Sequence, residues 1–298
     1  MVFEKYGKIR QLGHEDNSTL LANPNDNIVI EEKIDGANFR FMFLKGNILF
    51  GSRTQSLGDI DAKIGGNWKR CVEFIKERLN GVDLSEFEGM ILFGECCVKH
   101  SMEYNWDKIP PFLGFDVLNL QNLKYLGYPA CKSIFDQLEL PFVPIIKICK
   151  AGEINELTDE DIPKSVYGES QAEGIVIKNY KEQIFGKFVT VKFKEVNKSA
   201  FGESKKRASN DDDRLAAMYC TNARIDKQIF KLVNEGQQLH MKLMEFLPKN
   251  VINDIYEEHW KDICWSQWSV NFKNFRKKVA KRCMAVLKVI IVNAELNK

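Results

Sequence analysis

Several features of targeted or metal-binding proteins are missing from the sequence. No stretch of its 298 residues approaches the roughly 18 apolar residues of a membrane-spanning helix. The first 17 residues carry charges throughout and lack the apolar segment of a secretory signal. The eight cysteines form no C-x-x-C pair, which argues against a zinc site and indicates reduced thiols. We therefore expect a cytoplasmic protein, or one of the nucleus or of a virus-infected cell's cytosol, that is neither secreted nor bound to membranes.

Composition indicates a soluble globular chain long enough for two domains, with 44% hydrophobic and 28% charged residues. Net charge is only +2, so the balance alone predicts no polyanionic partner. The positive residues nevertheless gather near the C-terminus, where no acid stands between Asp262 and Glu295. This basic stretch suits either a phosphate backbone or a solvated helix face, and it contains Lys273, Arg276, Lys277, Lys278, Lys281, Arg282 and Lys288.

Strand-like and helix-like segments alternate through the first two thirds of the sequence, which predicts an α+β domain over residues 1–208. Lys45-Gly46-Asn47 is a hairpin turn in this prediction. The expected strands cover 28–32, 38–44, 48–53, 90–95, 111–117, 142–148, 174–180 and 188–194, and the expected helices cover 64–79, 130–139 and 153–160.

Residues 209–298 show only helical periodicity, so we expect a small all-helical C-terminal domain. Its start is marked by the polar segment 202–210 and by the acidic run 211–213, which suits the first turn of a helix. In the last helix, apolar residues at steps of three and four predict one inward stripe of Phe272, Phe275, Val279, Cys283, Val286 and Ile290. The tryptophans Trp260, Trp265 and Trp268 are expected in the core of this domain.

Lys33 stands just after a strand-like run and three residues before a glycine, in the sequence Glu-Lys-Ile-Asp-Gly. A lysine amine has a pKa near 10.4, so its use as a nucleophile requires a special environment. Taken alone, the pattern describes an exposed lysine at a strand–turn junction equally well. The order of the later motifs is more informative: Phe-Gly-Glu at 93–95, Phe-Asp at 115–116, Glu-Gly-Ile-Val-Ile-Lys at 173–178 and Val-Lys-Phe-Lys at 191–194.

These five elements, in this order, resemble the covalent nucleotidyltransferase superfamily of polynucleotide ligases and capping enzymes, and most closely the RNA ligase 2 family of ATP-dependent phage-type enzymes. The resemblance covers roughly residues 1–200. It implies a nucleotidyltransferase (ATP-grasp-like ligase) domain of antiparallel sheets flanked by helices. It also implies that Lys33 attacks ATP to form a lysyl-adenylate, that AMP passes to a 5′-phosphate end, and that a 3′-hydroxyl then displaces it.

The resemblance assigns residues to the phosphates and to the metal. Lys192 and Lys194 match the lysines at the α-phosphate and are expected to lower the pKa of Lys33, although lysines alternating on a strand more often form a solvated face. Glu173 matches the carboxylate that holds Mg²⁺ or Mn²⁺. Lys178 matches a further phosphate or nucleotide contact.

A second set of matches concerns the nucleotide itself. Glu95 matches a carboxylate at the ribose and reacting centre, and Phe115 matches the aromatic residue that stacks on adenine. Taken alone, Glu95 would be predicted as an exposed glutamate and Phe115 as a core phenylalanine. Glu32 matches a residue that reads the adenine edge. Arg53 matches a contact to ribose and the 5′-phosphate, and Asn38 matches an asparagine near the phosphates that favours the RNA ligase 2 branch.

The expected partner is nucleic acid, RNA with 3′-hydroxyl and 5′-phosphate ends in a nicked duplex or an RNA/DNA hybrid, as in RNA repair. Capping enzymes and most DNA ligases follow this core with a β-barrel domain, whereas the C-terminal part here is helical. The short segment 222–227 also resembles the start of the family's helical domain. A DNA ligase, a GTP-dependent capping guanylyltransferase and a catalytically inactive nucleotide- or RNA-binding module remain as alternatives.

Overall fold

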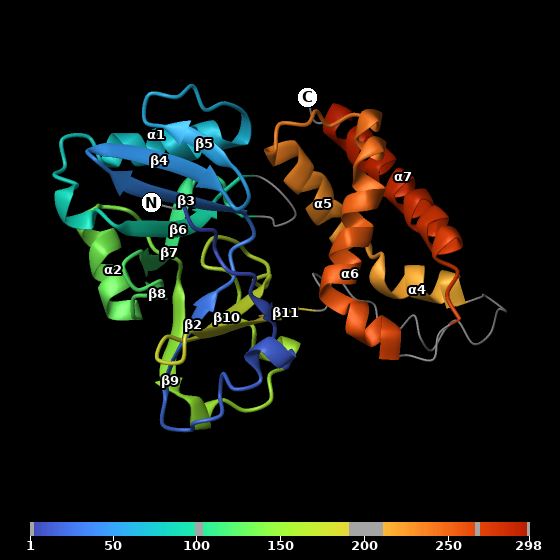
Figure 1. Ribbon diagram of the computed structural model, residues 1–298, viewed down its shortest axis with the longest axis horizontal. Coiled ribbons are helices and arrows are strands. Elements are labelled where there is room, and N and C mark those ends of the chain that lie inside the picture. The colour runs from blue at the N-terminus through green and yellow to red at the C-terminus, as the bar shows by residue number, and fades with distance from the viewer. Residues whose placement is uncertain (1–2, 99–103, 191–210, 266–268, 297–298) are drawn as a thin grey trace. The chain divides into compact units, whose positions relative to one another are not determined.

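The computed structural model describes residues 3–98, 104–190, 211–265 and 269–296 (Figure 1). The chain divides into two compact units, Met1–Val191 and Lys192–Lys298. The boundary predicted between residues 208 and 209 lies outside the described residues. The first unit contains both β-sheets, and the described part of the second is helical.

A six-stranded antiparallel sheet forms half of the first unit, with the strand order β5-β4-β3-β6-β7-β8. Lys45 and Gly46 both have positive φ angles, 53° and 73°, which is the backbone that a two-residue hairpin turn requires. The predicted turn is therefore confirmed. The strands are β3 (Ala37–Leu44), β4 (Asn47–Ser52), β5 (Ser56–Asp59), β6 (Met90–Cys96), β7 (Phe112–Asn119) and β8 (Lys124–Tyr125).

A five-stranded sheet forms the other half, in the order β1-β11-β10-β2-β9. Neighbouring strands are antiparallel except β1 and β11, which are parallel. Its central strand β10 carries the Glu-Gly-Ile-Val-Ile-Lys segment beside β2, which leads into Lys33. The strands are β1 (Arg10–Gln11), β2 (Asn27–Glu32), β9 (Ile145–Lys150), β10 (Gly174–Asn179) and β11 (Ile184–Val189).

Two helices, α1 (Lys69–Arg78) and α2 (Tyr128–Gln137), pack against strand β7 of the six-stranded sheet (Figure 1). The helix expected over residues 153–160 is wrong. That segment holds only the ends of two short 3₁₀ turns, Ala151–Glu153 and Asp159–Asp161. Its acidic side chains accept local backbone hydrogen bonds, as Asp161 does from Thr158 (2.7 Å), and such bonds compete with helix propagation.

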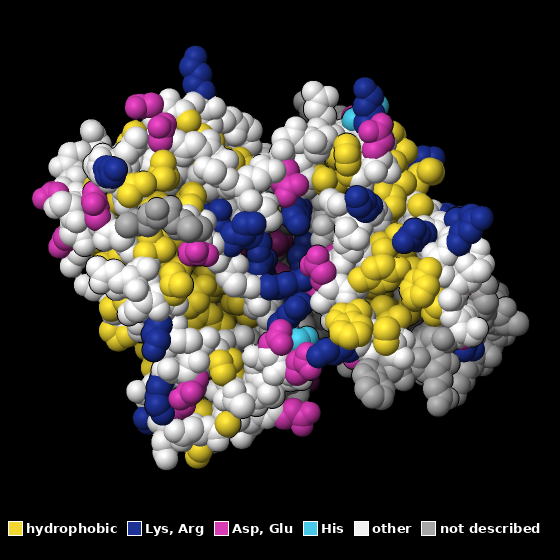
Figure 2. Space-filling view, viewed as in Figure 1, with side chains coloured by type: hydrophobic (Ala, Val, Ile, Leu, Met, Phe, Trp, Pro, Cys, Tyr) yellow, Lys and Arg dark blue, Asp and Glu magenta, His cyan; other side chains and the backbone are white. Residues whose placement is uncertain are grey.

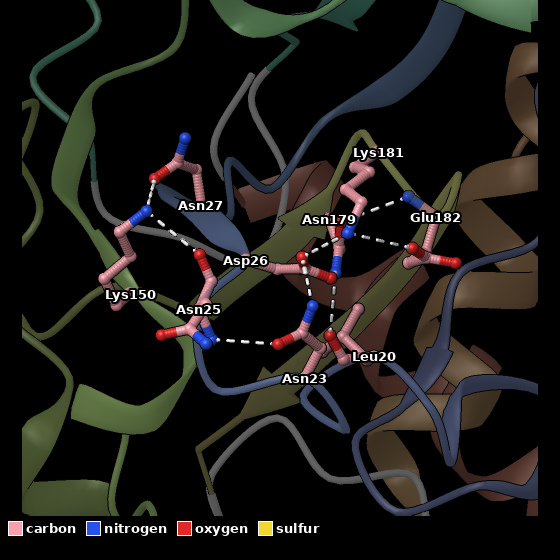
Figure 3. Close-up of polar contacts among 9 residues, drawn as sticks. All are labelled: Leu20, Asn23, Asn25, Asp26, Asn27, Lys150, Asn179, Lys181 and Glu182. Atoms are coloured by element: carbon pink, nitrogen blue, oxygen red, sulfur yellow. Dashed lines mark hydrogen bonds and ion pairs between the residues drawn. The ribbon is translucent and has the colours of Figure 1, made fainter.

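Polar contacts fasten the beginning of β2 to its neighbours (Figure 3). The buried Asp26 accepts hydrogen bonds from Asn179 at 3.1 Å and from Lys181 at 2.7 Å, both in the segment that ends β10 and follows it. On the other side, Lys150 of β9 donates to the side chain of Asn27 at 2.7 Å. These contacts fix the register of β2, and therefore the place where Lys33 leaves the sheet.

The second unit packs its helices around one apolar core. Phe275, Val279, Cys283 and Leu287 of the last helix are buried in it, whereas Phe272 is 49% exposed, so the predicted stripe is wrong at its first residue. Trp260 is also wrong as a core prediction, because it is 53% exposed. Described elements of this unit are α4 (Asp211–Tyr219), α5 (Asn222–Asn234), a 3₁₀ turn (Met241–Glu245), α6 (Leu247–Trp265) and α7 (Phe272–Leu296).

The acidic run 211–213 occupies the first turn of α4, as predicted, and also reaches the start of α7. Asp212 accepts a hydrogen bond from the backbone N–H of Asn271 at 2.6 Å, and Asp213 pairs with Lys278 at 2.6 Å. Among the described helices of both units, none is long and apolar enough to cross a lipid bilayer.

Candidate active site

Lys33 leaves the end of β2 and is held between the two central strands of the five-stranded sheet. Its backbone N–H donates to the carbonyl oxygen of Gly174 at 3.0 Å, which continues the β2–β10 ladder by one residue. Its Nζ donates to Oε2 of Glu173 at 2.6 Å. The two side chains are 22% and 14% exposed, so the ion pair is largely shielded but still reachable from solvent. The structure thus brings together two of the residues singled out from the sequence.

Gly36 lets the chain turn from Lys33 into the six-stranded sheet. A Cβ atom at this position would lie 2.8 Å from the carbonyl oxygen of Cys96 and 3.3 Å from Cβ of Glu95. The glycine therefore serves a close approach of two backbones, and its missing side chain lets Lys33 lie near Glu95. Between them, the backbone N–H of Asp35 donates to the Tyr104 hydroxyl at 2.9 Å, which holds this turn in place.

Asn38 and Glu95 face each other as direct cross-strand partners on β3 and β6. Oδ1 of Asn38 and Oε2 of Glu95 are buried, and neither has a hydrogen-bond donor within the described parts of the chain. Buried acceptors without donors are costly, and a cation satisfies them. Together with Glu173 they offer the hard oxygen ligands that Mg²⁺ or Mn²⁺ prefers. The described residues contain no preassembled group of three or more His, Cys, Asp or Glu side chains of the kind that encloses a metal.

The electrostatics of the site favour an ammonium on Lys33. Burial lowers the pKa of Lys33, but the nearby carboxylates of Glu173, Glu95 and Asp35 outweigh burial and raise it above its ordinary value. Burial also raises the pKa of Glu95, to about 8, against the opposing charges of Lys33 and Arg53. The lysines expected to lower the pKa of Lys33, Lys192 and Lys194, lie outside the described residues, and the described groups that act on it most strongly are acids.

Glu32 points to the opposite side of β2 from Glu31, as strand alternation requires. It is 2% exposed, and its carboxylate accepts hydrogen bonds from the Ser165 hydroxyl at 2.5 Å and the Val166 backbone N–H at 3.1 Å. In this structure Glu32 therefore anchors the loop before β10 beside Lys33.

Lys178 is not among the residues gathered around Lys33. It is 1% exposed, and its ammonium pairs with Glu31 at 2.7 Å and with Asp116 at 2.9 Å. A third hydrogen bond, to the carbonyl oxygen of Phe115, is 3.1 Å long. Asp116 also accepts from the Tyr6 hydroxyl at 2.5 Å. Since Asp116 lies on β7 and Lys178 on β10, this buried network joins the two sheets behind the site.

Phe115 and Arg53 both contact the N-terminal segment. The Phe115 ring, 7% exposed, meets the Tyr6 ring edge-on, with 4.9 Å between the ring centroids. Arg53 donates to the carbonyl oxygen of Gly7 at 3.2 Å, and its charge reaches Glu95. Of the two, Arg53 is the residue that the structure associates with the Lys33 group.

Lys192 and Lys194 lie outside the described residues. The sequence reasoning missed Asp35, Tyr104 and Lys187, whose charge lowers the pKa of Glu173 against the effect of burial. Asp35 lies within the lysine motif itself, so its position was a usable signal. Tyr104 and Lys187 come from a loop and from β11, and only the folded chain brings them near Lys33.

A family model described as RNA ligase matches residues 26–196, which is more than half of the 298 residues. No curated protein matches the chain.

Solved structures of Naegleria gruberi RNA ligase share the fold. One, of a mutant with ATP and Mn, is 18% identical with a TM-score of 0.50, covering 64% of this chain and 57% of that one. Another, of the ligase with PPi, is also 18% identical with a TM-score of 0.50, covering 68% of this chain and 58% of that one. The chain thus spans little more than half the length of these proteins, and at this identity the likeness shows the fold alone. By the match of its family model, the chain belongs to the RNA ligase family.

Proposed function

We propose that this chain is an ATP-dependent ligase that joins the 3′-hydroxyl and 5′-phosphate ends of RNA through AMP carried on Lys33. The single observation that carries the proposal is the Lys33–Glu173 pair, at 2.6 Å, beside the donorless acceptor oxygens of Asn38 and Glu95. A partly exposed amine next to open cation ligands suits nucleophilic attack on a metal-bound phosphate.

In the first step, the Lys33 ammonium gives a proton to Glu173 and its Nζ attacks the α-phosphorus of ATP. A nitrogen–phosphorus bond forms as the bond to the bridging oxygen breaks, pyrophosphate leaves with the electron pair, and the nitrogen releases its second proton to solvent to leave the neutral phosphoramidate. A 5′-phosphate oxygen then takes AMP from Lys33, whose nitrogen regains a proton. Finally the 3′-hydroxyl oxygen attacks the activated 5′-phosphorus, loses its proton and expels AMP.

Glu173 and Glu95 are the residues that would hold a divalent cation, Mg²⁺ or Mn²⁺. Such a cation neutralises the charge that develops on the phosphate oxygens. Solved structures of Naegleria gruberi RNA ligase mutants hold ATP and Mn, or AMP and Mn, and this supports ATP and a divalent cation as what the chain binds.

The remaining site assignments rest on the motif resemblance. We assign Asn38, Arg53 and Phe115 to the nucleotide, with Lys192 and Lys194 at the α-phosphate. We also assign Glu32 and Lys178 to the nucleotide site. Because both are buried, we propose that Glu32 acts by positioning the Ser165 loop and Lys178 by positioning β7.

We further assign residues 1–208 to nucleotidyl transfer and residues 209–298 to nucleic-acid contact. The support for the second assignment is α7, which carries seven lysine and arginine residues and one acid, Glu295. Such a helix can neutralise phosphates along an RNA strand.

The test is to incubate the protein with α-labelled ATP or GTP and Mg²⁺, and then to add nicked RNA or nicked DNA. We expect acid-stable label from ATP that disappears in Lys33→Ala and is transferred to a sealed RNA strand. Lys181→Ala is the matched control, because Lys181 is also paired with a carboxylate but is 64% exposed at the other end of β2.

The other outcomes separate the alternatives. Label from GTP alone would identify a capping guanylyltransferase, and sealing of the DNA nick alone would identify a DNA ligase. No label at all, in protein that still binds nucleotide, would leave the inactive binding module.

A further inference from the structure

Aromatic side chains are exposed together on the helical unit. Trp260 of α6 is 53% exposed and Phe272 of α7 is 49% exposed. Tyr256, which is partly buried, connects them: its ring centroid lies 6.0 Å from that of Phe272, and it precedes Trp260 by one helical turn. Figure 2 shows hydrophobic side chains gathered on the surface of this unit with Lys and Arg beside them. We call Tyr256, Trp260 and Phe272 the aromatic surface.

The backbone under this surface is well fixed. Phe272 begins α7, and the preceding Asn271 caps the helix by accepting hydrogen bonds from the backbone N–H groups of Lys273 and Asn274 at 3.1 and 3.2 Å. Asn271 is itself held by Asp212 at 2.6 Å. A rigid aromatic surface loses little conformational entropy when it binds a flat ligand.

On α6 the exposed charged neighbours of Tyr256 and Trp260 are of both signs, Glu257, Lys261 and Asp262, whereas those of Phe272 at the start of α7 are cations. Asp254 and Glu258, two acids on the same turns of α6, point inward and pair with the fully buried Arg224. Lys273 and Arg276 follow Phe272 at one and four residues, and the sequence has no acid between Asp262 and Glu295. Exposed rings with cations beside Phe272, and with two acids of α6 turned inward, match a chain of bases linked by phosphates on the Phe272 side of the surface.

We propose that the aromatic surface binds unpaired bases of single-stranded RNA, with Lys273 and Arg276 at the neighbouring phosphates. The inference rests on the proposed function, because it takes RNA as the substrate. It adds that the helical unit recognises an unpaired segment of that RNA. In a duplex the base faces are already stacked on each other, so exposed rings offer a duplex little. A protein partner for the same surface would not require the flanking cations.

The experiment measures binding of a fluorescent single-stranded RNA with a 5′-hydroxyl and a blocked 3′ end, which cannot be activated or joined. Each aromatic ring removed, in Trp260→Ala and in Phe272→Ala, should weaken binding by roughly ten-fold. Val292→Ala is the matched control, because Val292 is a comparably exposed apolar residue (52%) of α7, the helix that contains Phe272. It should leave the affinity for the strand unchanged. Trp260→Phe and Phe272→Tyr retain a ring and should retain most of the binding, even if the alanine variants fold poorly.

Cys264 gives a second readout that does not depend on affinity. It lies one turn beyond Trp260 on α6 and is exposed, whereas the other seven cysteines are buried. The single-stranded RNA should therefore protect Cys264 from alkylation, and a blunt RNA duplex of equal length should protect it less.

Several results would overturn the inference: wild-type protein that does not bind the strand, equal binding by Trp260→Ala and Val292→Ala, equal protection by strand and duplex, or a change in association state showing that the surface covers a second protein. Labelling of Lys33 by ATP is measured on the same variants and should be unchanged. If labelling fails in the wild type while strand binding holds, the proposed chemistry fails and the RNA surface stands.

Discussion

The first unit contains two lysines paired with carboxylates, one buried and one partly exposed, and their surroundings differ. Lys178 is 1% exposed and uses its three N–H groups on Glu31, Asp116 and the carbonyl oxygen of Phe115. Lys33 is 22% exposed, and among the described residues it pairs with Glu173 alone, beside acceptors that have no donor. An opposite charge is common to both. Exposure and the number of partners distinguish the reactive lysine from the structural one. Donorless acceptors do not, because Oε1 of Glu31 beside Lys178 is also buried without a donor among the described residues.

The largest expected contrast is in stability. Lys178→Met leaves two buried carboxylates without their cation and should lower the free energy of unfolding by about 3–5 kcal/mol. Lys33→Met should lower it by at most about 1 kcal/mol, because Glu173, its partner, is partly exposed and keeps access to solvent. Urea unfolding of both variants measures this, with the exposed Lys181→Met as control. Equal losses of unfolding free energy in Lys178→Met and Lys33→Met would contradict the proposed difference between the two lysines.

The next effect concerns the metal. Glu95→Gln should raise the Mg²⁺ or Mn²⁺ concentration needed for half-maximal labelling by at least about ten-fold, because it removes a charged ligand. Glu31→Gln is the matched control on the closed side, where Oε2 of Glu31 pairs with Lys178 at 2.7 Å, and it should leave the metal requirement unchanged. Metal titrations of the labelling rate decide the matter, and a shift of the same size in both variants would count against a cation at Glu95.

The pH dependence should also separate the two environments. The pKa of Lys33 is raised, so the fraction of free amine grows about ten-fold for each pH unit below that pKa, and Glu95 ionises near pH 8. Labelling should therefore rise from pH 7 to pH 9. In Glu173→Gln the amine loses its partner, its pKa falls, and the rise should begin at lower pH even though the maximum drops. Single-turnover labelling across pH tests this, and a profile that falls over this range contradicts it.

The smallest effect should come from Tyr6. Tyr6→Phe removes the hydroxyl that donates to Asp116 at 2.5 Å, but Asp116 keeps its contacts with Lys178 and with the Tyr180 hydroxyl. We expect a loss of about 1 kcal/mol in unfolding free energy and little change in the labelling rate. Thermal unfolding and labelling of the same preparation measure both. A large loss of labelling without loss of stability would show that Tyr6 acts in the reaction at Lys33 and not only in the buried network around Lys178.

The order of the motifs, through the family resemblance, was enough to predict that Lys33, Glu173 and Glu95 belong to one site, and the structure brings the three together. The α+β class and the helical second unit were also predictable from hydrophobic period alone. Burial of Lys178 was not, since its partners Glu31 and Asp116 come from two different sheets. Nor was the exposure of Trp260 and Phe272, because a helical stripe shows which residues share a face but not how far the partner helix covers it.

Strand β2 ends in three consecutive charged residues that enter three different environments. Glu31 joins the network between the sheets, Glu32 holds the loop at Ser165, and Lys33 enters the site. Inserting or deleting one residue in β2 would exchange all three environments at once. Changes of length are therefore expected to be lethal to function between Asp26 and Gly36, yet tolerable at the Lys45–Gly46 turn, which closes the next hairpin. The active site thus sets where this chain can evolve by gaining or losing residues.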